Sequence, residues 1–158
     1  MKRKRGIKEL IRGMKIKKSS HIALIIDGSK INLNEMEPQL SKIKMTLEEV
    51  GKIQSAKIIF KNLPSDELSK IIQNLGFDIS IYVSETDVYF VLEAMELIYN
   101  PKVEAVAIAT KNEEFLPLLT KGKEKGKKII AINLLDSKLD AETLTNLCDI
   151  IIDLNKSG

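Results

Sequence analysis

Tryptophan is absent from the sequence, aromatic residues make up only 4% of it, and Cys148 and His21 are its one cysteine and its one histidine. A single cysteine excludes an internal disulfide bond, and we interpret Cys148 as a small buried apolar residue. An unpaired cysteine fits a reducing compartment, so we expect a cytoplasmic protein. With few aromatic residues available, isoleucine, leucine and valine must fill the core.

Long hydrophobic runs and glycine-rich nucleotide motifs are also missing. No apolar run approaches the roughly 20 residues that a membrane helix needs, so we expect no transmembrane segment. The charged N-terminus lacks the apolar stretch of a secretion signal. Neither a P-loop nor a G-x-G-x-x-G motif is present, which argues against a nucleotide cofactor.

Positive charge is concentrated at the start of the chain. Residues 1–18 hold nine lysines and arginines and one acid, a net charge of +8, whereas the whole chain carries +3, which leaves −5 for residues 19–158. We therefore predict a basic tail over residues 1–18 and a single domain over residues 19–158. A basic arm of this kind is typical of nucleic-acid backbone binding, and it is also what a solubilising arm looks like. The residues expected to contact nucleic acid are Lys2, Arg3, Lys4 and Arg5.

Part of this tail has the spacing of an amphipathic helix. Its apolar residues recur at helical intervals, at Ile7, Leu10, Ile11 and Met14. A helix with one apolar face could also dock on the domain, on a partner protein or on an anionic membrane.

Apolar runs alternate with helical patterns along the rest of the chain. Residues 22–26 are all apolar, as in a strand of a parallel sheet that is buried on both faces. Residues 77–83 alternate between apolar and polar, which predicts a half-exposed strand at a sheet edge. Further strands are predicted over residues 56–60, 103–109, 128–133 and 150–154. This order predicts an α/β three-layer sandwich with a mostly parallel central sheet, in which residues 22–26 are central and residues 103–109 lie beside them.

Polar residues follow three of these predicted strands. Asp27 and Gly28 come directly after residues 22–26, at the point where α/β sheets bind their ligands. Asp87 and the pair Asn112 and Glu114 follow two later strands. Clustered carboxylates repel one another unless they hold a cation, and oxygen ligands select Mg²⁺ or Mn²⁺. Asp27, Asp87 and Glu114, with Asn112 beside it, are therefore candidate ligands of such an ion.

A purely structural interpretation of two of these segments is also open. Ser84-x-x-Asp87 and Thr110-x-x-Glu113 both match the capping box, which satisfies the free N–H groups at the start of a helix. Either motif alone is more often a cap than a metal site.

Four blocks, taken in order, resemble the NYN domain, a family of the PIN-like nuclease superfamily. They read Ile-Ile-Asp-Gly, then Glu-Thr-Asp-Val, then Ala-Thr-Lys-Asn-Glu-Glu-Phe-Leu-Pro-Leu, then Lys-Gly-Lys-Glu-Lys-Gly-Lys-Lys-Ile, and the resemblance covers residues 22–154. It implies a Rossmann-like fold and an acidic site that binds Mg²⁺ or Mn²⁺ and cleaves RNA. Asp27 and Asp87 match the acids of the first and second blocks.

The third block departs from the family pattern, Asp-x-Asp-Phe. Asn112 stands at its first acid and Glu114 at its second, and Lys30 replaces an asparagine that follows the first block. Asn112 keeps a carbonyl oxygen but removes one negative charge from the site. Glu114 keeps the charge on a longer arm, and Lys30 adds a cation that could neutralise an acid or contact a phosphate.

Three functional interpretations follow from this sequence. The first is a metal-dependent ribonuclease with Asp27, Asp87, Asn112 and Glu114 as its catalytic residues and with Lys30 and the tail as its RNA contacts. The second is a catalytically degenerate PIN-like domain that binds RNA or a protein. The third is an interaction scaffold whose partner binds the tail. The sequence leaves open whether the protein forms homo-oligomers.

Overall fold

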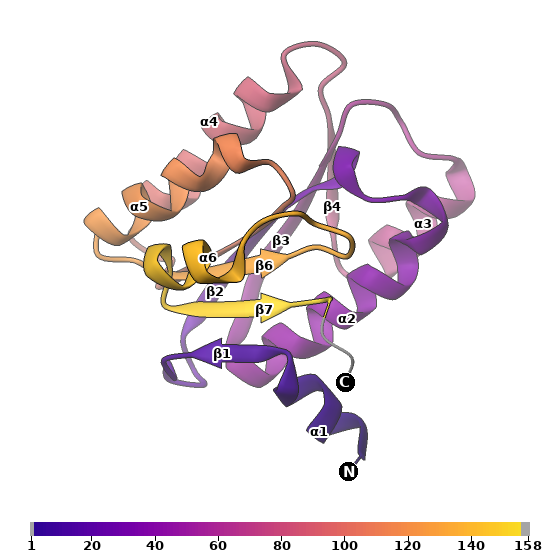
Figure 1. Ribbon diagram of the computed structural model, residues 1–158. Helices are drawn as coiled ribbons and strands as arrows, with labels where there is room; N and C mark the ends of the chain where they lie inside the picture. The colour runs from indigo at the N-terminus through magenta and orange to yellow at the C-terminus, as the bar shows by residue number, and fades with distance from the viewer. Residues whose placement is uncertain (1, 156–158) are drawn as a thin grey trace.

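The computed structural model describes the backbone of residues 2–155 and the side chains of residues 6–140 and 142–155. One seven-stranded sheet runs through it in the order β1-β7-β6-β5-β2-β3-β4 (Figure 1). The strands are β1 (Ile11–Gly13), β2 (His21–Asp27), β3 (Lys52–Phe60), β4 (Asp78–Ile81), β5 (Ala105–Thr110), β6 (Lys128–Asn133) and β7 (Ile150–Asp153). All neighbours pair in parallel except β1, which is antiparallel to β7.

Six α-helices in the described part of the chain cover this sheet. They are α1 (Lys2–Glu9), α2 (Met36–Val50), α3 (Asp66–Asn74), α4 (Thr86–Tyr99), α5 (Leu116–Glu124) and α6 (Ala141–Leu147). Successive residues of β2 point to opposite faces. Ile22, Leu24 and Ile26 pack in the core under α2 and α3, and Ala23 and Ile25 pack in the core under α4, α5 and α6. The predicted three-layer α/β sandwich is confirmed.

The central strand is the one that the sequence predicted. β2 lies between β3 and β5 and is buried over its whole length after His21. The chain passes from β2 to β3 and β4 on one side and then crosses back to β5 on the other. The end of β2 is therefore the point at which strand order reverses, and Asp27 is the last residue of β2. The predicted edge strand is also confirmed, because β4 lies at the end of the sheet.

The N-terminal segment differs from the expected helix. α1 ends at Glu9, and Ile11–Gly13 forms the edge strand β1. Leu10 is completely buried in the core under α2, and Arg12 lies opposite Ile151 of β7. Part of the tail is helical, as its apolar spacing predicted, but the helix does not reach Met14, because Ile11–Gly13 pairs with β7 instead. The side chains of Lys2, Arg3, Lys4 and Arg5 lie outside the described residues.

Two further features follow from elementary rules. Pro117 stands in the first turn of α5, where its missing N–H costs no helical hydrogen bond. Cys148 is buried directly after α6, and burial raises the pKa of its thiol to about 11, so it is an unreactive core residue as predicted.

No helix within residues 2–155 is long and apolar enough to cross a membrane.

Candidate functional site at the carboxyl edge of the sheet

Four buried polar residues form a row across the carboxyl ends of β2, β5, β6 and β7. The pairing of Ile26 with Ala109 places Asp27 beside Thr110, and the register then continues to Asn133 and Asp153. All four residues are buried. The residues two positions earlier pack in the core under α4, α5 and α6, so the row points to that face.

Asp27 is the most buried member of the row, with 2% of its surface exposed. Ser29 Oγ donates to its Oδ1 at 2.8 Å, and Thr110 Oγ1 donates to its Oδ2 at 3.2 Å. Burial raises the pKa of the Asp27 carboxyl, while these two hydrogen bonds and the charge of Lys30 lower it. The negative charge of Asp87 raises this pKa further, so Asp87 lies close enough to repel Asp27.

Thr110 connects Asp27 with the third sequence block. Its Oγ1 accepts a hydrogen bond from the Asn112 backbone N–H at 3.0 Å while it donates to Asp27. Asn112 Oδ1 in turn accepts from the Glu114 backbone N–H at 3.0 Å and caps a short 3-10 helix, Glu113–Phe115. Asn112 is therefore the cap, and the Thr110-x-x-Glu113 capping box does not form.

Asp87 lies in the first turn of α4 and is exposed. The residue that precedes α4 is Glu85, which has a left-handed backbone (φ 56°) and makes no side-chain capping bond. Because Ser84 is not the capping residue, the second predicted capping box is absent too. Asp87 is thus not used as a cap, and its charge is stabilised by the positive end of the α4 dipole.

The arrangement fits an ion held by two carboxylates better than one held by three. Within the described residues, no group of three Asp, Glu, His or Cys side chains lies close enough to hold a metal. Asp27 and Asp87 do interact through their charges, and a cation would remove their repulsion. Mg²⁺ commonly uses one or two carboxylates and keeps several waters. That Glu114, which is exposed on the 3-10 helix, joins the same ion remains a prediction.

Sequence reasoning missed the rest of the row. Asn133 Nδ2 donates to Asp153 Oδ1 at 3.3 Å, while Asn133 Oδ1 is buried and has no hydrogen-bond donor. Asn155 also donates to Asp153 Oδ1, from its backbone N–H at 3.0 Å and from its side chain at 3.2 Å. Asn133 and Asp153 lie at or near the ends of two predicted strands, and that position was the available signal.

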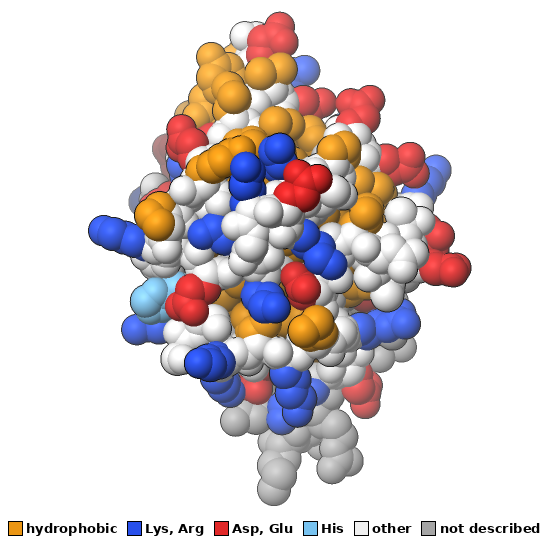
Figure 2. Space-filling model, turned by 90° about the vertical axis from the view of Figure 1, so that its left-hand side faces the viewer, with side chains coloured by type: hydrophobic (Ala, Val, Ile, Leu, Met, Phe, Trp, Pro, Cys, Tyr) orange, Lys and Arg blue, Asp and Glu red, His pale blue; other side chains and the backbone are white. Residues whose placement is uncertain are grey.

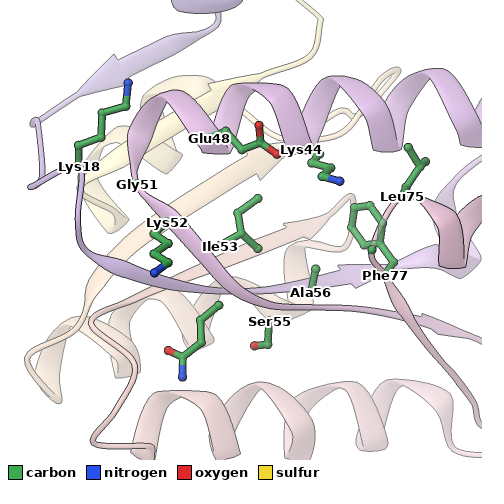
Figure 3. Close-up of a pocket in the computed structure, with 12 residues that line it drawn as sticks. Lys18, Lys44, Glu48, Gly51, Lys52, Ile53, Ser55, Ala56, Leu75 and Phe77 are labelled. Atoms are coloured by element: carbon green, nitrogen blue, oxygen red, sulfur yellow. The ribbon is translucent and has the colours of Figure 1, made fainter.

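A hollow of about 600 Å³ lies far from this row, at the amino end of β3 (Figure 3). It is lined by Lys18, Lys44 and Lys52 and by one acid, Glu48, over an apolar floor that includes Phe77. It lacks a buried carboxylate held by hydroxyl groups. The carboxyl edge of the sheet is therefore the stronger candidate for a catalytic site.

The comparison with known families agrees with the fold. Residues 21–155 match the NYN domain. The chain belongs to the NYN domain family. The match begins at the first residue of β2 and includes all four members of the polar row, and the fold is accordingly of the nuclease type that this family represents.

One curated relative covers most of this NYN chain. It is the uncharacterized protein MJ0482 of Methanocaldococcus jannaschii, which is 34% identical over 141 residues, or 89% of this chain. The chain spans 58% of the length of that relative. Among solved structures, levoglucosan dehydrogenase in complex with NADH has a TM-score of 0.38 at 16% identity, covering 72% of this chain and 27% of the enzyme. Its apo form has a TM-score of 0.39 at 18% identity, covering 76% and 27%. These low scores support no statement about activity.

Proposed function

We propose that this NYN domain is a divalent-metal-dependent ribonuclease that acts on single-stranded RNA. The observation that carries the proposal is Asp27, a buried carboxylate at the switch point of the sheet whose two oxygens are each held by a hydroxyl group. Such a carboxylate is costly to the fold unless a cation binds it. Membership of the NYN family supports RNA as the substrate.

Asp27 and Asp87 would hold Mg²⁺ or Mn²⁺ together with bound waters, and Glu114 would contact the ion through one of those waters. When bound, the ion activates a water molecule and stabilises the charge that develops on the phosphate. The hydroxyls of Ser29 and Thr110 fix the Asp27 carboxylate, so its remaining lone pairs point in a defined direction. Lys30 is exposed beside Asp27 and can contact a phosphate oxygen of the substrate.

Because of Asn112, we expect this domain to cleave RNA slowly. Its carbonyl oxygen already accepts the Glu114 N–H, and as an amide it adds no negative charge to the site. Metal binding then depends on fewer charges, and we expect cleavage to need Mn²⁺ or high Mg²⁺. The same observation supports a second candidate function, a domain that binds RNA without cleaving it.

A metal titration of RNA cleavage separates the two functions. Wild type, Asp27→Asn and Asn112→Asp are purified identically and incubated with single-stranded RNA across a range of Mn²⁺ and Mg²⁺ concentrations. Asp78→Asn is the matched control, because it makes the same change in an exposed acid at the amino end of β4. A ribonuclease is expected to lose its activity in Asp27→Asn, to keep it in the control and to become faster in Asn112→Asp.

Other outcomes contradict the enzymatic proposal. An inactive wild type that gains cleavage in Asn112→Asp would identify a degenerate nuclease, and RNA binding would then be measured directly. Cleavage that is indifferent to Asp27→Asn would come from a contaminant.

A further inference from the structure

Helix α4 has a second apolar face that the fold does not bury. Phe90, Ala94 and Ile98 pack in the core, as one face of an amphipathic helix should. A different set of apolar side chains is exposed: Val88 by 52%, Leu92 by 53% and Tyr99 by 54%. Hydrophobic side chains gather on the upper part of this side of the molecule (Figure 2).

The exposed residues form a continuous stripe with Met95. At about 100° per residue, Val88, Leu92, Met95 and Tyr99 fall within about 60° of one another around the helix. Met95 is half-buried and joins the stripe to the core under α4 and α5. We call these four residues the α4 stripe. Monomeric proteins seldom leave such a row of large apolar side chains in water, and exposed patches of this kind mark interaction sites.

The charges around the α4 stripe are unequal at its two ends. Glu85 and Asp87 are exposed at the N-terminal end. Lys102 is exposed just beyond the C-terminal end, and Lys125 Nζ lies 5.2 Å from the centre of the Tyr99 ring. The four side chains of the stripe carry no positive charge, so the stripe is not suited to a phosphate backbone. An apolar centre between an acidic and a basic end is instead complementary to its own antiparallel copy.

We propose that the α4 stripe is the interface of a homodimer in which α4 packs antiparallel against α4 of a second copy. A two-fold axis between Leu92 and Met95 places Val88 opposite Tyr99 of the other copy and Leu92 opposite its Met95. The same axis brings Glu85 toward Lys102 and Lys125 of the other copy. The arrangement is isologous, so each favourable contact occurs twice, and the antiparallel helix dipoles add to it.

The composition of the stripe suits the centre of such an interface. Tyrosine and methionine are enriched at the centre of protein interfaces, and the rim around it is polar and accessible to water. A stable dimer buries about 800 Å² on each partner, so the stripe must be surrounded by polar contacts. Glu96 on α4 and Lys125 directly after α5, whose Nζ lies over the Tyr99 ring, are exposed polar residues beside the stripe. The dimer does not depend on the proposed ribonuclease activity.

The oligomeric state of the whole 158-residue chain tests the proposal. Sedimentation equilibrium is measured over a range of concentrations for wild type, Leu92→Asp and Leu63→Asp. Leu63 is the matched control, because it is a leucine with 71% exposure in the loop after β3, outside the stripe. We expect a wild-type dimer, an unchanged dimer for Leu63→Asp, and a dissociation constant at least about 30-fold higher for Leu92→Asp.

A charge exchange tests the antiparallel orientation. Glu85→Lys places two basic ends together and should weaken the dimer, and the double variant Glu85→Lys with Lys102→Glu should restore it. Circular dichroism and thermal unfolding verify that each variant is folded. A monomeric wild type, an equal effect of Leu63→Asp, or a dimer unaffected by Leu92→Asp would overturn the proposal. A double variant as weak as Glu85→Lys would overturn the antiparallel arrangement.

Discussion

Asp27 shows how one residue can oppose the stability of the fold that positions it. Its carboxylate is almost completely buried, and burial together with the charge of Asp87 raises its pKa above the ordinary value of 3.8. The folded protein therefore holds the Asp27 proton to a higher pH than the unfolded chain does. Between 3.8 and the raised pKa, the free energy of unfolding falls as the pH rises, because the native state binds more protons.

Asp27→Asn is accordingly expected to make the protein more stable at neutral pH while it removes activity. The amide carries no charge to be desolvated, and its oxygen can still accept a hydroxyl hydrogen bond. The gain should shrink as the pH falls through this window and vanish below 3.8, where wild-type Asp27 is protonated in both states. Thermal unfolding at neutral and acidic pH measures it. A variant that is less stable than wild type at neutral pH would mean that Asp27 stabilises the metal-free fold.

Thr110 is expected to affect metal binding by holding the Asp27 carboxylate in place. Thr110→Val keeps the shape of the side chain but removes the hydroxyl that donates to Asp27 Oδ2 and accepts from the Asn112 N–H. Loss of a hydrogen bond to a metal-ligating side chain typically lowers metal affinity or activity by about 10- to 100-fold. Mn²⁺ binding by calorimetry checks this directly, and Thr110→Ser, which keeps the hydroxyl, should remain close to wild type. Equal losses in both variants would indicate a packing effect instead.

Gly28 is required by a close approach of the backbone to β3. A Cβ added to it would lie 2.8 Å from Ile58 Cγ1 and from Phe60 Cε1, and 2.9 Å from the Ile59 carbonyl oxygen. The carbonyl cannot move without disturbing the sheet, so Gly28→Ala should destabilise the protein by about 1–3 kcal/mol. Urea unfolding measures this loss in the free energy of unfolding. Gly126→Ala does not serve as a matched control, because Gly126 has a positive φ and an alanine there would be strained for a different reason. An unchanged midpoint would show that the turn after β2 can shift.

At the level of secondary structure, sequence patterns predicted the elements with strong local signals. The apolar residues of β2 and the alternation in β4 identified a central and an edge strand correctly. The three residues of β1 have no such signal, because pairing with β7 alone makes them a strand. The two capping boxes were likewise misleading. Their spacing is right, but Glu85 and Asn112 occupy the capping positions.

The candidate site was predictable only in its outline. Asp27 could be placed from the end of an apolar run and from the family resemblance, because both depend on neighbours in sequence. The contacts of Asp27 with Thr110, and the row that continues to Asn133 and Asp153, depend on the register between strands that are distant in sequence. Register is a property of the assembled sheet, so no local pattern shows it.

At the scale of the whole molecule, the basic segment is joined to the domain. Leu10 lies in the core and β1 extends the sheet, so a deletion of residues 1–18 would disturb the fold as well as remove charge. The proposed RNA contacts at Lys2, Arg3, Lys4 and Arg5 are better tested by changing all four to alanine, because this leaves Leu10 and β1 in place.

The four alanine substitutions are expected to weaken the binding of single-stranded RNA and to flatten its salt dependence. Each phosphate contact contributes about −0.7 to the slope of log affinity against log salt, so the slope should change by up to about 3. The control removes four exposed lysines scattered over the domain, Lys52, Lys70, Lys123 and Lys138. If general attraction between a basic protein and RNA were responsible, both variants would lose the same slope, because each loses four positive charges. A fall confined to the α1 variant, measured by fluorescence anisotropy in the absence of metal so that no RNA is cleaved, would locate the phosphate contacts in α1. An unchanged slope would show that α1 serves another partner.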